Sequence, residues 1–178
     1  MNNGTPRGRE RAEPVEVTGR SMKFHLLEGR ERYELRIDYE GRWYHEGVEI
    51  VRDDIRTLFS RNLRRDKDGG YYIEIGRDEA PVVVEDAPFV VLRVTEASDG
   101  LSLLLSDGTL EPLDPRTLTF TGDNVPYCRV RGGLEARFSR AAYYQLARFI
   151  SYDEHKDTYC LNIGDDHMQL PVDRDRRS

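Results

Sequence analysis

The chain has 178 residues, a length that suits one domain or one domain built from two halves. Hydrophobic residues make up 38% of it and charged residues 34%, so we expect a compact core under a highly charged surface rather than a fully disordered chain. The formal net charge of -6 disfavours nucleic acids and anionic membrane surfaces as partners, because both are polyanions.

The cysteine count and the chain ends indicate a compartment. Cys128 and Cys160 are too few for a disulfide framework and read as reduced, buried thiols. No apolar run is long enough to span a bilayer, and residues 1–20 lack the apolar segment of a secretory signal. We therefore expect a cytoplasmic protein with a flexible tail over 1–20 and a short charged tail over 174–178.

The first ordered segment is predicted to be β-structure followed by a helix. Apolar and charged residues alternate from Tyr33 to Glu40, a period of two that is typical of a half-buried strand. Two short strands are expected next, opened by Trp43 and by Val48. The spacing of apolar residues then predicts a helix from Arg52 to Leu63, with its acidic residues at the start and its basic residues at the end.

A run of hairpins is predicted after that helix. Glycine-containing turns separate short apolar runs, which is the usual signature of antiparallel hairpins. Pro112 and Pro115 either weaken the strand expected over Thr109–Leu113 or place it at a sheet edge, because proline cannot donate to a ladder. The expected strands are Tyr71–Ile75, Val82–Val84, Phe89–Thr95, Leu101–Leu105, Thr109–Leu113 and Val125–Val130.

The last part of the chain repeats the pattern of a helix and a hairpin. A second helix is predicted from Arg140 to Ile150, with Ser139 as its N-cap because a serine hydroxyl accepts an otherwise unpaired backbone N–H. Strands Tyr159–Ile163 and Met168–Val172 are expected to follow around a glycine turn.

The two halves correspond at a constant offset of 88 residues. Arg140 then falls on Arg52, and the later Ile-Gly-x-Asp turn falls on the earlier one without a gap, although chance similarity of two helix–hairpin segments is the alternative. We predict an α+β fold of antiparallel β-hairpins with two short helices, arranged as two repeated strand–helix–hairpin units over 21–88 and 89–173.

The segment from Gly47 to Phe89 resembles a known family. It contains a Gly-Val-Glu-Ile-Val-Arg stretch, a helical Leu-Phe pair, an Asp-Gly-Gly-Tyr turn and a closing Val-Glu-Asp-Ala-Pro-Phe stretch. These features resemble bacterial domain-of-unknown-function family 1285. The resemblance implies repeated motifs and a signalling or ligand-sensing role, and it implies no enzyme activity. The extra glycine, Gly70, departs from the family pattern and leaves the register of that hairpin open.

Four residues are candidates for a ligand-binding site. Arg52 and Arg140 precede the two helices and could bind a carboxylate or phosphate through their fork of donors, or could pair with a structural acid. Asp86 could be the polar floor of a pocket with Phe89 as its wall, or could fix the turn before Pro88. We expect any such site to lie between the two halves, since clefts favour such positions.

The function predicted from sequence is a non-enzymatic module that binds an unknown small molecule or protein, in signal transduction. We expect no cofactor and no metal, because His155, Cys160 and His167 lack the spacing of a zinc site and no phosphate-binding or nucleophile motif is present. Two alternatives stay open. One is an enzyme of unfamiliar type that uses Asp86 with His45 or Glu85, and the other is a structural subunit that forms a homodimer through strand edges and tyrosines.

Overall fold

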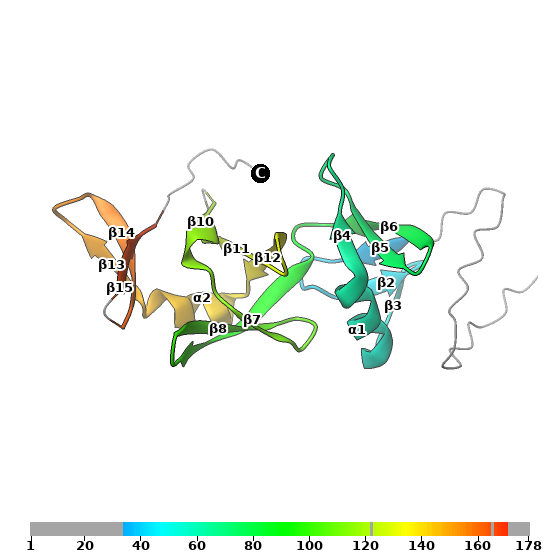
Figure 1. Ribbon diagram of the computed structural model, residues 1–178, viewed down its shortest axis with the longest axis horizontal. Helices are drawn as coiled ribbons and strands as arrows, with labels where there is room; N and C mark the ends of the chain where they lie inside the picture. The colour runs from blue at the N-terminus through cyan, green and yellow to red at the C-terminus, as the bar shows by residue number, and fades with distance from the viewer. Residues whose placement is uncertain (1–33, 122, 165, 171–178) are drawn as a thin grey trace, which may run out of the picture. The chain divides into compact units, whose positions relative to one another are not determined.

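The computed structural model describes residues 34–121, 123–164 and 166–170, and the predicted tails lie outside these ranges. The described residues fall within one compact unit, Arg32–Ser178. They form a mostly β, α+β structure with two α-helices and three sheets (Figure 1).

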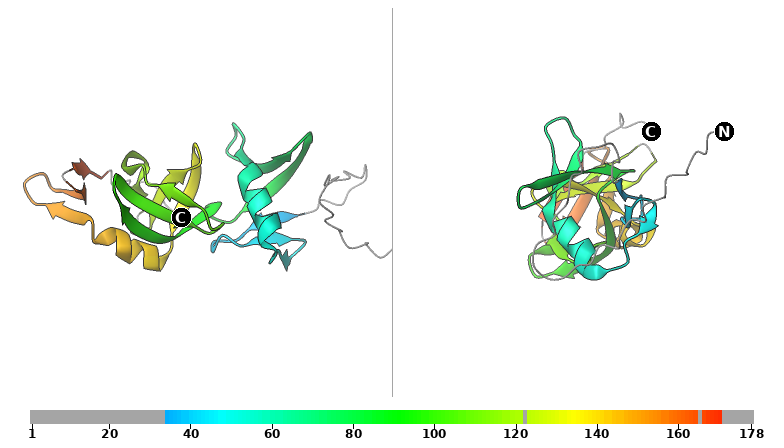
Figure 2. Two further views of the ribbon diagram at one scale, coloured as in Figure 1. Left: turned by 60° about the horizontal axis from the view of Figure 1, so that its bottom comes forward. Right: turned by 90° about the vertical axis from the view of Figure 1, so that its right-hand side faces the viewer.

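The first sheet has six strands in the order β3-β2-β1-β6-β5-β4. Its central pair, β1 and β6, is parallel, with Leu35 opposite Val82 and Ile37 opposite Val84, whereas the other pairs are antiparallel. The only helix within this segment, α1, packs on β5 and joins the two edge strands (Figure 2). Its elements are β1 (Leu35–Ile37), β2 (Trp43–His45), β3 (Val48–Glu49), α1 (Asp53–Asn62), β4 (Leu63–Arg65), β5 (Tyr71–Ile75) and β6 (Asp78–Val84).

The second sheet repeats this strand arrangement. Its order is β10-β11-β12-β7-β8-β9, again with a central parallel pair, in which Ala136 lies opposite Phe89. In both sheets the chain runs from the centre to one edge, crosses over, and returns from the other edge to the centre. Its elements are β7 (Phe89–Ala97), β8 (Gly100–Leu105), β9 (Leu110–Pro112), the 3-10 helix η1 (Pro115–Thr117), β10 (Thr119–Phe120), β11 (Pro126–Val130) and β12 (Leu134–Phe138).

The third sheet is a meander of three antiparallel strands that follows α2. The helix contacts β7 and β12 of the second sheet and β13 of the third (Figure 1). The elements are α2 (Arg140–Ala147), β13 (Ile150–Asp153), β14 (Thr158–Ile163) and β15 (Asp166–Gln169).

The core is assembled from the predicted apolar positions. Phe59 brings the apolar face of α1 into the first sheet, where it meets Trp43 edge to face at 5.4 Å between ring centroids. Leu63, the first residue of β4, is buried directly after the helix. Phe89 and Phe138 are central in the second sheet. Burial of such side chains stabilises the fold by about 1.5–3 kcal/mol each.

The predicted repeat is matched only in part. A helix followed by a three-stranded meander occurs twice, and the hairpin pairs Ile73–Ala80 and Leu161–Met168 lie 88 residues apart. However, the equivalent strands β1 and β7 of the two six-stranded sheets are not 88 residues apart. The second of these sheets also contains no α-helix between its edge strands. The strand–helix–hairpin unit therefore stays a prediction, and the all-antiparallel expectation is corrected by the parallel pairs β1–β6 and β7–β12.

Candidate functional site

Asp86 lies in the segment that joins β6 to β7, and its carboxylate is engaged by the second sheet. The Tyr127 hydroxyl donates to both carboxylate oxygens at 2.9 Å, and Nε of Arg137 lies 3.4 Å from Oδ2. The neighbouring acid, Glu85, instead pairs with Arg36 of the first sheet. The two adjacent carboxylates therefore serve different arginines, and their geometry is that of two separate ion pairs.

Arg137 extends this cluster to the first sheet. Its Nη1 donates to the backbone carbonyl of Tyr39, in the β1–β2 turn, at 3.2 Å. The same turn approaches the β8–β9 turn so closely that a Cβ added to Gly41, where φ is +77°, would lie 2.6 Å from Oγ of Ser106. Only glycine suits both the backbone angle and the space. Asp86 thus belongs to a hydrogen-bonded joint between two sheets.

Phe89, the predicted pocket wall, is a fully buried residue of β7. The guanidinium of Arg131 lies 5.0 Å from its ring centroid, within cation–π range. Nη1 of Arg131 donates to the carbonyl of Ser60 in α1 at 3.1 Å, and Nη2 donates to Thr109 Oγ1 at 2.8 Å and to the Asp107 carboxylate. The guanidinium of Arg131 therefore connects α1, which packs on the first sheet, to β7 and the β8–β9 turn of the second sheet.

Arg131 occupies an unfavourable backbone conformation to make these contacts. It opens the β11–β12 turn with φ of +49°, followed by Gly132 with φ of +72°. Gly133 follows with φ of +133°, so all three residues of the turn have positive φ, which favours glycine or asparagine over arginine. The sequence Arg-Gly-Gly indicates the turn itself. The hydrogen-bond partners of the Arg131 side chain lie 22 to 71 positions away, so no local sequence pattern predicts them.

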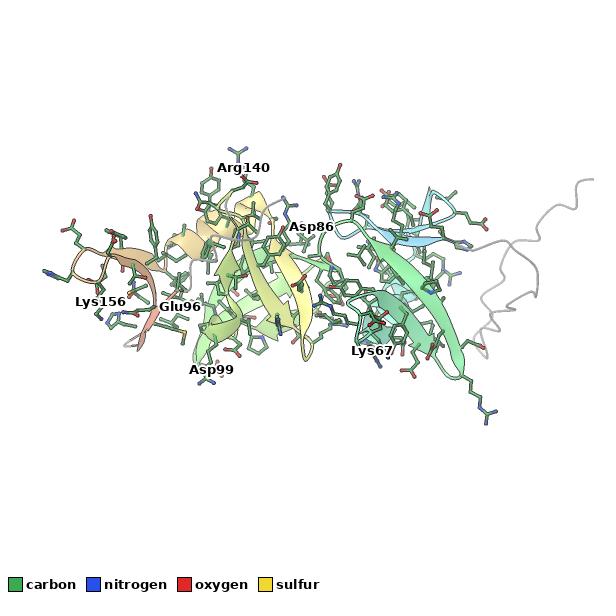
Figure 3. All side chains as sticks on the ribbon, turned by 90° about the horizontal axis from the view of Figure 1, so that it is seen from above. Lys67, Asp86, Glu96, Asp99, Arg140 and Lys156 are labelled. Atoms are coloured by element: carbon green, nitrogen blue, oxygen red, sulfur yellow. The ribbon has the colours of Figure 1, made fainter. Side chains whose placement is uncertain are left out.

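The two predicted arginines lie apart from this joint. Arg52 precedes α1, is half exposed, and donates to both carboxylate oxygens of Asp54 at 3.1 and 2.6 Å. The hydrogen bond with Asp54 raises the pKa of Arg52, and the same contact lowers the pKa of Asp54. Arg140 opens α2, points away from the ribbon (Figure 3), and lies 6.0 Å from the Tyr144 ring centroid. The four predicted residues therefore do not share one set of contacts.

Exposed tyrosines gather in the last part of the described chain. Tyr144 of α2 is 60% exposed, and Tyr152 and Tyr159 of the third sheet are about half exposed. The latter two lie opposite each other on β13 and β14, with ring centroids 5.2 Å apart. The hydroxyl of Tyr152 donates to Asp157, which raises the pKa of Tyr152. Tyrosine combines a large apolar ring with a polar tip, which suits a protein interface.

A small groove lies beside the edge strand β9. Its volume is about 210 Å³, and its apolar lining comes chiefly from Leu101, Leu110 and Leu113. Sites for small organic ligands span roughly 300–1,000 Å³, so this groove is below that range. Pro112 lies at the end of β9, which is an edge strand as the prolines predicted.

Two buried groups have perturbed pKa values with structural causes. Burial alone would raise the pKa of Asp38, but hydrogen bonds from Arg42, Glu40 N–H and Tyr44 outweigh it and lower the pKa. Burial raises the pKa of Cys128 to about 12, which makes it a poor nucleophile.

Within residues 34–121, 123–164 and 166–170, no group of three or more His, Cys, Asp or Glu residues could hold a metal ion. Among these same residues, neither helix is long and apolar enough to cross a membrane.

One family model and two solved structures are similar to this chain. Residues 28–87 match the family model described as "Domain of unknown function (DUF1285), N-terminal domain". A crystal structure of a DUF1285 family protein from Silicibacter pomeroyi DSS-3 has a TM-score of 0.63 and 25% identity, covering 77% of this chain and 79% of that one. A second, from Shewanella baltica OS155, has a TM-score of 0.58 and 26% identity, covering 64% and 90% respectively. No curated protein matches the chain at a significant level.

These comparisons confirm the resemblance to the DUF1285 family. The family match covers β1 to β6, the whole first sheet, and the structural similarity extends over a larger share of the chain.

Proposed function

We propose that this chain is a non-enzymatic protein-binding module, and that its binding face lies on α2 and the third sheet. The observation that carries the proposal is that three tyrosines within sixteen positions of the chain, Tyr144, Tyr152 and Tyr159, have side chains about half exposed or more. Large exposed aromatic groups mark interaction sites, and tyrosine is enriched among the residues that dominate binding energy.

The rest of the predicted site supports a protein partner over a small molecule. Asp86 and Arg137 are bound to each other in the joint between sheets, and Arg52 is bound to Asp54. The groove beside β9 has room for one or two amino-acid side chains rather than a typical cofactor. The wider proposal of a role in signal transduction rests on the family resemblance.

Photocrosslinking inside bacterial cells tests this proposal. A photoreactive phenylalanine analogue would replace Tyr144, Tyr152 or Tyr159, one at a time. Tyr39 provides a matched control, because it is 59% exposed and lies in the β1–β2 turn of the first sheet. We expect a discrete crosslinked protein from the three test positions and none from position 39. Equal crosslinking at position 39, or no product at any test position, would contradict the proposal.

A further inference from the structure

One face of α2 is fixed firmly to the second sheet. Ala142 and Leu146 are fully buried, and the Gln145 side chain accepts a hydrogen bond from the backbone N–H of Val94 at 2.7 Å. This bond falls just beyond the irregularity in β7 between Val91 and Arg93. At the helix start, the backbone N–H of Ser139 donates to Val91 O at 2.9 Å. The helix is thus held at both ends.

The opposite face of α2 carries a stripe of three long side chains. Arg140, Tyr144 and Arg148 are all exposed and are spaced four residues apart, so they follow one line along the helix surface. The exposed residues on either side of this stripe, Ala141 and Ala147, are small. A tyrosine therefore stands between two arginines on a flat helical surface, and the two arginine Cα atoms are about 12 Å apart along the axis.

The charge of this stripe is not balanced locally. The sequence Arg140–Arg148 contains no acidic residue, and neither arginine takes part in an ion pair with the described residues. Among the described residues, the guanidinium of Arg140 makes only a cation–π contact, with the Tyr144 ring. Arg36, Arg52 and Arg137 are each paired with a carboxylate, whereas Arg77 and Arg93, like the two arginines of the stripe, take part in no ion pair among the described residues.

From this arrangement we propose that the α2 stripe docks an acidic helical segment of a partner protein. This rests on the proposed function and adds the chemistry of the partner. Two carboxylates about 12 Å apart, seven or eight residues along a partner helix, would meet Arg140 and Arg148. An apolar side chain between them would cover Tyr144, and the flanking alanines let the helices approach closely. The chain's overall charge of -6 favours such a local contact over a long polyanion such as nucleic acid.

The anchored helix α2 fixes the positions of the stripe residues before a partner binds. Because α2 is anchored through Ser139 and Gln145, the three side chains hold their spacing without being ordered by the partner. Binding then avoids the cost of ordering the backbone, which otherwise weakens small interfaces. Exposed charge pairs contribute modestly and lose strength with salt, so the contact should be weak alone and sensitive to ionic strength.

Fluorescence anisotropy with designed peptides tests the proposal. The probe is a labelled helical peptide of about 18 residues with glutamates seven residues apart and a leucine between them, and its controls carry glutamine or lysine at the glutamate positions. We expect the full chain to bind the glutamate peptide more tightly than the glutamine peptide, with affinity that falls as salt rises. Single-stranded DNA of matched charge is the polyanion control.

Charge reversal on the stripe makes the test specific. R140E/R148E should weaken binding of the glutamate peptide by about tenfold or more and should gain binding of the lysine peptide. The double variant R77E/R93E is a matched control, since both arginines are exposed, Arg77 in the β5–β6 turn of the first sheet and Arg93 on β7 of the second. Equal losses in both double variants, no binding of the glutamate peptide, or tighter Arg140-dependent binding of DNA would overturn the proposal.

Failure here is distinguishable from failure of the proposed function. If the crosslinked partner is recovered at positions 144, 152 and 159 but its affinity is unchanged in R140E/R148E, the protein-binding function stands and the acidic partner is excluded. If no partner crosslinks but the glutamate peptide binds through Arg140 and Arg148, the charge chemistry stands and the tyrosine face is wrong.

Discussion

Arg131 is predicted to contribute more to stability than any other charged side chain in the joint between the sheets. Its side chain is only 16% exposed, and that of its partner Asp107 only 3%. Breaking a buried ion pair from one side typically costs about 3–5 kcal/mol, because the remaining charge is left buried. Asp107 retains donors from the backbone N–H and hydroxyl of Thr109, so we expect Arg131→Ala to cost about 2–3 kcal/mol.

The positive φ of Arg131 sharpens this prediction. Alanine at φ of +49° keeps the left-handed strain, about 1–2 kcal/mol, while glycine relieves it at a smaller entropic cost. Arg131→Gly should therefore be more stable than Arg131→Ala by roughly 0.5–1 kcal/mol, although both lose the same contacts with Ser60, Asp107 and Phe89.

Urea denaturation followed by circular dichroism and by Trp43 fluorescence measures these differences. Trp43 lies in the first sheet and donates to the Ser60 hydroxyl, so it reports on the side of the joint opposite Arg131. A loss below about 0.5 kcal/mol in Arg131→Ala would refute the reasoning that the guanidinium holds the sheets together. Equal stability of the alanine and glycine variants would show that the turn is not strained.

Three further predictions concern local contacts. Because the folded pKa of Asp38 is lowered, its contribution is present above its ordinary pKa of 3.8 and is lost as pH falls through the folded value. Asp38→Asn should therefore show a shallower loss of stability in acid titrations below pH 3.8. In a Cys160→Ser background, Cys128 should not react with a disulfide reagent at pH 8 unless denaturant is added, and rapid native labelling would contradict its burial. Ser139→Ala should lower the unfolding free energy by about 1 kcal/mol, because its hydroxyl accepts from Ala142 N–H, whereas the exposed change Arg140→Ala should stay within about 0.5 kcal/mol in the same thermal melts.

Local elements were predictable from the sequence because their signals are local. The structure confirms both helices within three residues of their predicted bounds and confirms Ser139 as an N-cap. Helix α2 ends at Ala147 rather than Ile150, since Ile150 opens β13, and its buried face is formed by Ala142 and Leu146. Short strands such as β4 and β13 were missed because three or four residues after a helix resemble its continuation.

Long-range pairing was not predictable in the same way. The parallel pair β7–β12 joins segments about 47 positions apart, and no turn residue marks such a pairing. The strand β12 itself had a detectable signal, since Leu134, Ala136 and Phe138 alternate with charged residues. The pairing of β12 with β7 had no such signal, because parallel register depends on the three-dimensional arrangement of the crossover.

The candidate site shows the same division. Sequence reasoning selected Arg140 for its position before a helix, and the structure leaves it exposed beside Tyr144. Asp86 and Phe89 were selected from an adjacent motif, and their contacts with Tyr127, Arg137 and Arg131 come from residues 41 to 51 positions away. Ligand binding by Arg52, Asp86, Phe89 and Arg140 stays a prediction.

The central claim, that α2 and the third sheet bind a protein, is tested most directly by one affinity comparison. The dissociation constant of the crosslinked partner would be measured by calorimetry for the wild type, Tyr144→Ala and Tyr39→Ala, two substitutions of equally exposed tyrosines. Truncating an interface residue that contributes measurably to binding costs about 1 kcal/mol or more, so we predict at least about a fivefold weaker affinity for Tyr144→Ala and no change for Tyr39→Ala. Equal affinities for the two variants would contradict the claim.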